Sequence, residues 1–297
     1  MSSAIFHNAP GSDPLLIRTM VPADLPLCRR LVSAAGWNQT DGDWIRAMKL
    51  APDGCFVAEK GSVAVATTTC CGFGETGWIA MVLVDPEYRG SGIAGSLMQH
   101  AIAYLQGRGV KSIRLDATAM GQKVYRKLGF RDEYEVIRYE GTAGEEVSGN
   151  RDSLQVILST GTLLTQIAGL DKKATGAERS EFLENLDATK AATYWFKMSR
   201  DGTAEGYAGF RTGRNAVQIG PAVAFTVQTG QMLLDAVLAD FPGKACFIDI
   251  PADNEPAVRW AGSRGFKVQR SFMRMYLGEK PSDRPDWIWA SSGPEKG

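Results

Sequence analysis

The sequence predicts an α/β (α+β) protein in which two copies of one fold follow each other along the chain. Three observations predict this. The chain has 297 residues, which is long for a single hydrophobic core. Its first half alternates short apolar runs with amphipathic stretches of helical period. Its second half repeats several of these elements at an offset of about 135 residues.

The first two elements are predicted helices. Asp24 is placed to cap a helix over 25–35, and Gly36 is placed to stop it. Thr40, with Asp43 three residues later, resembles a capping box that opens a second helix ending near residue 50.

Three strands follow. The runs CFVAE (55–59) and SVAVATTTC (62–70) are joined by a tight turn at Lys60 and Gly61. After a turn over 72–77 comes WIAMVLV (78–84), which is apolar throughout. That pattern is typical of a central strand covered on both faces.

The rest of the first half has the same alternation. Ile93, Leu97, Ala101 and Leu105 recur at spacing four, which predicts a helix packed against a sheet. A strand (113–117), a short helix (121–128) and a final strand (134–140) complete the unit. The small, polar segment 141–152 is the expected linker.

The second half repeats the plan. IGP (219–221), GQMLLDAVLADF (230–241), ACFIDIP (245–251) and the segment 253–266 match elements of the first half in order. We therefore expect a first domain over 1–140, a linker over 141–152, a second domain over 153–280 and a C-terminal tail over 281–297.

Composition excludes several classes of protein. The 33 basic and 33 acidic residues give a formal net charge of zero, so there is no electrostatic case for binding nucleic acid or an anionic membrane. No apolar run approaches the roughly 20 residues of a membrane span, and the N-terminus lacks the features of a signal peptide. We expect a cytoplasmic protein, either a monomer or a homodimer.

Cysteine and histidine usage also limits the chemistry. The five cysteines have neither disulfide nor zinc spacing, which predicts buried thiols in a reducing compartment. The chain has two histidines, His7 and His100, so a histidine-based triad or a histidine-rich metal site is nearly excluded. We expect no metal.

The stretch MVLVDPEYRGSGIAGSLM (81–98) is the main functional signal. Gly90, Gly92 and Gly95 match G-x-G-x-x-G, the pattern of a dinucleotide-binding turn. That turn needs its first glycine directly after the strand, whereas five residues separate this strand from Gly90. Asp116, at the end of the next strand, stands about where a ribose-binding acid belongs, so an oxidoreductase remains an alternative.

The same stretch also contains Arg89-x-x-Gly92-x-Ala94, which resembles the R/Q-x-x-G-x-G/A signature of the GCN5-related N-acetyltransferases (GNAT). The segments V-D-P-x-Y-R-G-x-G-I-A and V-Y-x-x-L-G-F are similar to that family at matching separation, and the resemblance covers 17–140. GYAGFRTGR, IGPAVA and SFMRMYLG resemble the C-terminal half of a two-domain group in the superfamily. The resemblance implies tandem GNAT folds, each a mixed, mostly antiparallel twisted sheet flanked by helices.

The resemblance implies acetyl-CoA as cofactor and coenzyme A as co-product. Free backbone N–H groups at a helix N-terminus carry partial positive charge and can cradle a pyrophosphate where no side chain intrudes. In the family, a strand backbone holds the acetyl carbonyl and the pantetheine arm, and a neighbouring helix contributes further positions. The implied cofactor-binding residues are Met81, Val82, Leu83, Val84, Arg89, Gly90, Ser91, Gly92, Ile93, Ala94, Gly95, Thr118, Gly121 and Tyr125.

Tyr125 matches the family's tyrosine that protonates the departing thiolate. A phenol with a pKa near 10 is a reasonable partner for a thiol with a pKa near 8.5. The family often has asparagine where this chain has Thr118, and alanine where it has Gly121. No glutamate occurs in 78–84, where many members place a general base. The remaining candidates are Glu75, Asp116, Asp41 or a water held by backbone carbonyls.

The segment GWNQTDGDW (36–44) is expected to line the acceptor side, with Trp37, Asn38, Gln39 and Asp41 in contact with the acceptor. The alternative for its tryptophans, Trp37 and Trp44, is a place in the core.

The aligned positions of the second copy depart from the pattern. Ala261 stands where the tyrosine would be, and 226–231 offers one glycine. That copy should not bind acetyl-CoA in the usual way.

These observations predict an N-acetyltransferase that moves acetyl from acetyl-CoA to a primary amine of a small molecule by direct attack on the thioester. One alternative is a sensor or scaffold that binds acetyl-CoA without turnover. Another is a protein or peptide acetyltransferase. A second domain that caps the site favours a small acceptor, because capping narrows access.

Overall fold

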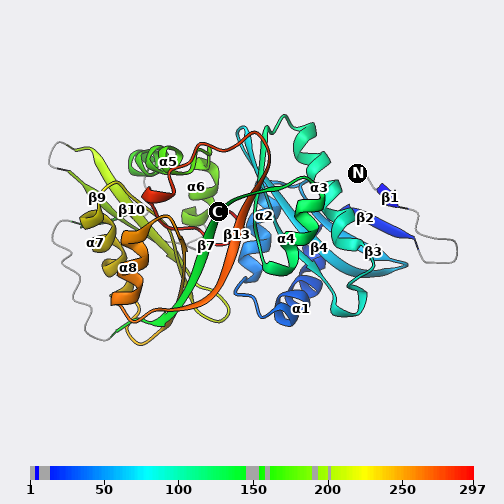
Figure 1. The fold of residues 1–297 in the computed structure, drawn as a ribbon, viewed down its shortest axis with the longest axis horizontal. Helices are drawn as coiled ribbons and strands as arrows, with labels where there is room; N and C mark the ends of the chain where they lie inside the picture. Colours follow the sequence, from blue (N-terminus) through cyan, green and yellow to red (C-terminus); the bar gives the residue numbers. More distant parts are fainter. Residues whose placement is uncertain (1–3, 7–13, 145–153, 158–160, 189–192, 200–201) are drawn as a thin grey trace.

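The computed structural model describes residues 4–6, 14–144, 154–157, 161–188, 193–199 and 202–297 (Figure 1). Their strands form one continuous sheet that runs the length of the molecule, with helices packed on it. The sheet is mixed and largely antiparallel; the parallel pairs are β5 with β6 and β11 with β12. The predicted fold class is therefore confirmed.

The first half contains strands β1 to β7 and helices α1 to α4. Its elements are β1 (Ala4–Phe6), β2 (Leu15–Thr19), η1 (Pro22–Asp24), α1 (Leu25–Ala35), α2 (Asp41–Leu50), β3 (Cys55–Lys60), β4 (Val63–Phe73), β5 (Thr76–Val84), η2 (Pro86–Tyr88), α3 (Ile93–Gly107), β6 (Ser112–Ala117), α4 (Ala119–Lys127) and β7 (Arg131–Thr142).

The second half contains strands β8 to β14 and helices α5 to α8. Its elements are β8 (Leu154–Ile157), α5 (Gly161–Thr175), α6 (Ser180–Ala188), β9 (Thr193–Met198), β10 (Ala204–Arg211), β11 (Val217–Ala224), α7 (Val227–Leu238), β12 (Ala245–Pro251), α8 (Glu255–Ser263), β13 (Lys267–Gly278), η3 (Pro285–Trp287) and β14 (Ile288–Ala290).

The first two helices form where the sequence predicts them, but one cap differs. Gly36 ends α1 in the left-handed conformation, with φ of 63°, and Thr40 and Asp43 form the predicted capping box of α2. The Asp24 carboxylate does not cap α1. It accepts hydrogen bonds from Arg18 (2.8 Å) and from the Val21 N–H (2.9 Å), so this part of the prediction is wrong. A guanidinium from the adjacent strand competes for the carboxylate.

Strand β5 is central, as its apolar run predicts. It lies between β4 and β6 in the sheet. Ile79 packs in one core cluster with residues of α3, whereas Trp78 and Ala80 pack in another with residues of α1 and α2. Successive strand side chains point to opposite faces, so helices cover both faces of this strand.

The two halves exchange their last strands. The strand order is β1-β2-β3-β4-β5-β6-β13-β7-β12-β11-β10-β9-β8, so β13 pairs with β6 while β7 pairs with β12. The expectation that a final strand over 134–140 completes the first unit is not met, because β13 takes that place. In Figure 1, β7 and β13 lie side by side at the centre of the molecule.

Where the structure describes them, the expected linker and the expected tail are part of the sheet and the buried core. Strand β7 extends to Thr142, inside the predicted linker, and residues 145–152 lie outside the described residues. The segment 281–297 contains β14, which pairs with β11, and its last residues are mostly buried. A tail of the kind that the sequence analysis separated from the domains does not form.

Candidate active site

A bulge in β5 opens the sheet. Opposite Thr67 to Thr69 of β4, strand β5 carries one extra residue, and Met81 adopts a φ of 51°. Thr67 Oγ1 donates a hydrogen bond to Met81 O at 3.1 Å. Bulges of this kind redirect a strand next to active sites. Strand β5 pairs with β6 only over Thr76–Trp78, so the two strands are already unpaired where the bulge occurs.

The glycine-rich turn ends beside this opening. Gly90 and Gly92 have φ of 79° and 83°, a region that L side chains rarely adopt, and Gly92 is the N-cap of α3. The Ser96 N–H donates to Gly92 O at 3.1 Å, so the N–H groups of the three residues before it have no intrahelical partner. Those residues are Ile93, Ala94 and Gly95. The turn therefore presents a helix N-terminus that suits an anion.

The turn is braced by its own side chains. Arg89 Nε donates to Val84 O at 3.1 Å, and Ser91 Oγ donates to Tyr88 O at 2.5 Å. The space beside Gly92 is open, because a Cβ built there would meet nothing within 4 Å. Met81 and Leu83 belong to the core on the side of α1 and α2, whereas Val82 and Val84 are only partly buried.

Tyr125 of α4 faces the same opening. A Cβ on Gly121 would lie 2.8 Å from its ring, so glycine at that position makes room for the tyrosine. Thr118 caps α4 by accepting a hydrogen bond from the Gly121 N–H at 3.4 Å. Burial raises the pKa of Tyr125 to about 12, which keeps the phenol protonated at neutral pH.

The opening leads into a narrow cavity of about 70 Å³. Its walls come from β5, β6, α4, the exchanged strands β7 and β13, the loop before α2 and the C-terminal segment. The lining residues are Trp37, Gln39, Ile79, Ala80, Met81, Val82, Leu115, Asp116, Thr118, Tyr125, Arg138, Arg270, Phe272, Pro294 and Glu295.

The expected acceptor residues divide into two groups. Trp37 and Gln39 line the cavity. Asn38 is buried beside it, where its Oδ1 accepts from the Asn215 N–H (2.8 Å) and its Nδ2 donates to Ala216 O (3.1 Å). Asp41 lies on the surface, paired with Arg29, whose hydrogen bond lowers the pKa of the carboxyl. Asn38 therefore joins the halves.

None of the three expected carboxylate bases is free in the cavity. Glu75 lies in the turn before β5, exposed and paired with Lys111 at 2.5 Å, and it does not line the cavity. Asp116 lines the cavity, but both of its oxygens accept hydrogen bonds from Arg274 of β13, at 2.8 and 2.9 Å. Asp41 lies outside. Because β13 lies beside β6 in the exchanged arrangement, the guanidinium of Arg274 contacts the Asp116 carboxylate.

Similarity to known proteins agrees with this geometry. A model of the acetyltransferase (GNAT) family matches residues 27–130, and a second model of an acetyltransferase (GNAT) domain matches residues 167–290. The chain is a tandem member of the GNAT superfamily.

Three proteins match this GNAT chain over most of their length and of its own. Holothin acyltransferase from Pseudoalteromonas sp. is 25% identical over 266 residues, which is 89% of this chain and 88% of that protein. A solved structure from Pyrococcus horikoshii, described as an acetyltransferase, has 22% identity and a TM-score of 0.82 over 98% and 99% of the two chains. A tandem GNAT protein from the clavulanic acid biosynthesis pathway has 15% identity and a TM-score of 0.64, over 91% and 100%.

The second GNAT half has the same strand opening but fills it with its own chain. Strands β11 and β12 pair only over Val217–Ile219, as β5 and β6 do in the first half. Strand β14 then pairs with β11 beyond that point. Trp289 covers the start of α7, because a Cβ on Gly230 would lie 1.9 Å from its indole ring. Ala261 is fully buried.

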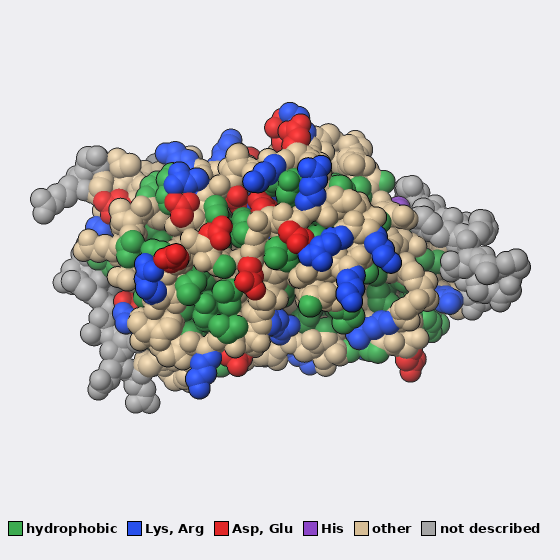
Figure 2. Space-filling view, in the orientation of Figure 1, with side chains coloured by type: hydrophobic (Ala, Val, Ile, Leu, Met, Phe, Trp, Pro, Cys, Tyr) green, Lys and Arg blue, Asp and Glu red, His purple; other side chains and the backbone are tan. Residues whose placement is uncertain are grey.

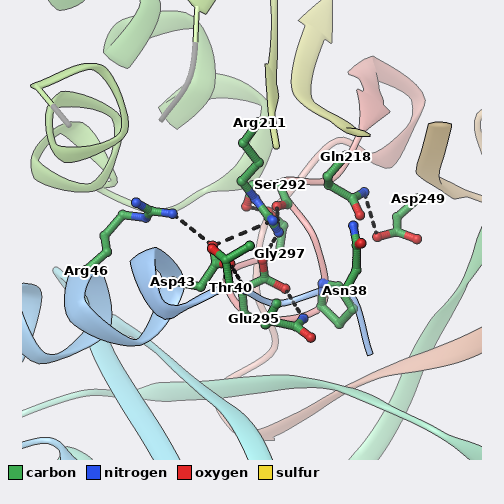
Figure 3. Close-up of polar contacts among 12 residues, drawn as sticks. Asn38, Thr40, Asp43, Arg46, Arg211, Gln218, Asp249, Ser292, Glu295 and Gly297 are labelled. Atoms are coloured by element: carbon green, nitrogen blue, oxygen red, sulfur yellow. Dashed lines mark hydrogen bonds and ion pairs between the residues drawn. The ribbon is translucent and has the colours of Figure 1, made fainter. Parts of the chain in front are cut away.

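Glu295 is the lining carboxylate that sequence reasoning missed. It is 5% exposed, ion-paired with Arg211 of β10, and its Oε2 accepts from Gln39 Nε2 at 3.0 Å. Figure 3 shows Asp43 between Arg46 and Arg211, with Glu295 below Arg211. The run WIWA (287–290) was the available signal that 281–297 is folded.

Three further features of the described residues bear on function: the cysteines, the possible metal ligands and the possible membrane-spanning helices. All five cysteines are free and buried, as predicted, and burial raises the pKa of Cys28 and Cys55 to about 12. In the described ranges, no group of three histidine, cysteine or acidic side chains is arranged to hold a metal ion. None of the described helices combines the length and the apolarity needed to span a bilayer.

Proposed function

We propose that this protein is an N-acetyltransferase that moves acetyl from acetyl-CoA to a primary amine of a small molecule. One observation carries the proposal: Tyr125 lines a cavity beside β5 where its pairing with β6 has ended, and the turn before α3 contacts the end of the same strand through the Arg89 Nε–Val84 O hydrogen bond. The relative named for its acceptor, holothin, supports acyl transfer to a small molecule. Residues 1–140 are the proposed catalytic domain, and 153–280 are the degenerate copy.

The residues present fit the cofactor. Gly90 and Gly92 leave the helix N-terminus open, so the N–H groups of Ile93 to Gly95 would hold the pyrophosphate. The unpaired edge of 81–84 would hold the pantetheine arm. Helix α4 adds three exposed basic side chains at Lys123, Arg126 and Lys127, and Figure 2 shows basic side chains over this part of the first half. When bound, acetyl-CoA supplies the thioester carbonyl that the amine attacks.

The chain contributes proton transfer and positioning. Tyr125 donates the proton that the leaving thiolate takes up. Glu295 is ion-paired with Arg211, as Asp116 is with Arg274, so it accepts a hydrogen bond from the amine, and a water takes up the amine's proton. No covalent intermediate is proposed, because all five cysteines are buried.

The enclosed cavity favours a small acceptor over a protein. Trp37, Gln39, Pro294 and Glu295, from the loop before α2 and the C-terminal segment, form part of its lining. A volume of about 70 Å³ leaves little room for a peptide chain. The absence of a free carboxylate on β5 still favours, as an alternative, a sensor that binds acetyl-CoA without turnover.

A direct test combines turnover and binding. Release of thiol from acetyl-CoA should accelerate with at least one member of a panel of amines, amino acids, polyamines and aminosugars. Acetyl-CoA should also stabilise the protein against heat, by about 2.7 kcal/mol at 100 times its dissociation constant, whereas NAD should not. Stabilisation without turnover on any amine would support the sensor. Stabilisation by NAD alone would overturn the proposal.

Gly92→Asp should abolish the stabilisation by acetyl-CoA while the protein stays folded. Aspartate tolerates the left-handed region better than most residues, and the added side chain meets nothing nearby. Its charge and bulk oppose a pyrophosphate at the helix N-terminus. Gly109→Asp is the matched control, because it has a φ of 79° and open space at the other end of α3. Native affinity for acetyl-CoA in Gly92→Asp, measured by calorimetry, would place the cradle elsewhere.

A further inference from the structure

One cation in the cavity lacks a carboxylate partner. Four ionic side chains line it, and three of them are paired: Asp116 with Arg274, Arg138 with Asp249, and Glu295 with Arg211. Within the described part of the chain, no carboxylate pairs with the fourth, Arg270. Its Nε donates to Gln269 Oε1 at 3.0 Å, which leaves its two terminal amino groups for a ligand.

The surroundings of Arg270 suit an anion. It lies on β13 opposite Arg138 of β7, and Phe272 is on the same face of the strand. Arg270 is half-buried, and burial, with the charge of Arg138, lowers its pKa. Asp249 neutralises Arg138 with two hydrogen bonds of 2.7 Å, and Glu140 acts on Arg270 through its charge alone, so in the described part of the chain no carboxylate is ion-paired with Arg270. A bound anion would pair with it directly.

The C-terminal segment and the loop before α2 offer the opposite chemistry. Gln39 Oε1 is buried and, among the described residues, has no hydrogen-bond partner. Gln39 Nε2 is already used by Glu295. A buried acceptor without a donor is costly, so this position is suited to a ligand that brings an N–H group. The lining of the cavity therefore contains both hydrogen-bond acceptors and a cation.

We propose that the acceptor is an amine that also carries a carboxylate. It is either a free amino acid or a molecule that ends in an amino acid. Arg270 would bind the carboxylate, and Gln39 and Glu295 would face the amine. A planar guanidinium can bind a carboxylate through two parallel hydrogen bonds. The single charge of the Arg270 guanidinium matches one carboxylate, whereas a phosphate brings nearly two negative charges. Trp37 and Phe272 add apolar contact area.

This inference rests on the proposed function. Substrates that differ in the carboxylate test the carboxylate site separately from N-acetylation. The measurement is kcat/KM for phenylalanine and for 2-phenylethylamine, which differ by the carboxylate, with phosphoethanolamine as the phosphate arm. Wild-type protein should prefer phenylalanine. In Arg270→Gln the ratio of the two values should fall roughly 10- to 100-fold, as expected for the loss of a hydrogen bond between charged groups.

Lys267→Gln is the control, because it removes an exposed cation from the same strand. It should leave the ratio at the wild-type value. An equal effect of Arg270→Gln on both amines, or no effect on either, would overturn the carboxylate site while N-acetylation stands. A preference for phosphoethanolamine over both would also overturn it.

If neither amine is acetylated, the carboxylate site can still be tested separately from the proposed function. Calorimetry with phenylalanine in the presence of coenzyme A then measures the site directly. Binding by wild-type protein that Arg270→Gln removes would support the carboxylate site even without turnover. No binding by wild-type protein would overturn it.

Discussion

Tyr125→Phe should lower kcat by about 10²–10⁴, the range expected for loss of a general acid. The ring and its packing remain, so the affinity for acetyl-CoA should change little. Because burial holds the pKa of Tyr125 at about 12, the defect should be the same at pH 6 and pH 9. Steady-state kinetics over this pH range, with calorimetry of acetyl-CoA binding in parallel, checks both expectations.

Two controls separate chemistry from packing. Tyr104→Phe removes the hydroxyl of another partly buried tyrosine, on α3, and should leave kcat unchanged. Ala261→Tyr should create no second activity, because β14 and Trp289 fill the equivalent opening of the second half. A wild-type rate in Tyr125→Phe would remove its role as acid and assign protonation of coenzyme A to a water or to another residue.

Arg274→Met should destabilise the whole protein by about 3–5 kcal/mol, because it leaves the Asp116 carboxylate buried without its partner. The two side chains are 2% and 1% exposed, and Arg274 also donates to Tyr134 Oη (2.9 Å) and Ser291 Oγ (3.2 Å). These contacts join β13, β6, β7 and the C-terminal segment. Urea unfolding, followed by a probe in each half, should show one shared transition at lower concentration.

A solvent-exposed ion pair provides the control for the buried pair of Arg274 and Asp116. Arg259→Met breaks the pair with Glu255 on α8, where both side chains are more than half exposed, and should cost less than about 1 kcal/mol. The double variant Arg274→Met with Asp116→Leu should regain part of the lost stability, because no buried charge is left unpaired. If Arg274→Met unfolds only the second half, the exchanged strands do not couple the halves.

Much of the local structure could be predicted because its causes are local. The capping box of Thr40 and Asp43 and the stop at Gly36 depend on neighbours within a few residues. The apolar run of β5 predicts its central place, and the helical spacing after Gly92 predicts α3. The glycine-rich turn and Tyr125 were found by motif, since each lies within one short segment. The proposed cofactor site is built mostly from such segments.

The proposed acceptor site could not be predicted in the same way. Asp116 was a candidate base until β13 placed Arg274 against it, and those residues are 158 positions apart. Asn38 was expected to face the acceptor, but it holds a loop 177 to 178 residues away. No periodicity or motif reports such pairings, because they depend on which strand lies beside which.

By itself, then, the sequence determined the repeated α/β plan, the open helix N-terminus at Gly92 and the place of Tyr125 on α4. Only the tertiary structure decided that the halves exchange β7 and β13, that β14 closes the second opening, and that Glu295 reaches the first site. The contact between Gln39 and Glu295 spans 256 residues. The physical reason is that local propensity and capping act over one or two turns of chain, whereas strand order and buried ion pairs are selected by the packing of the whole sheet.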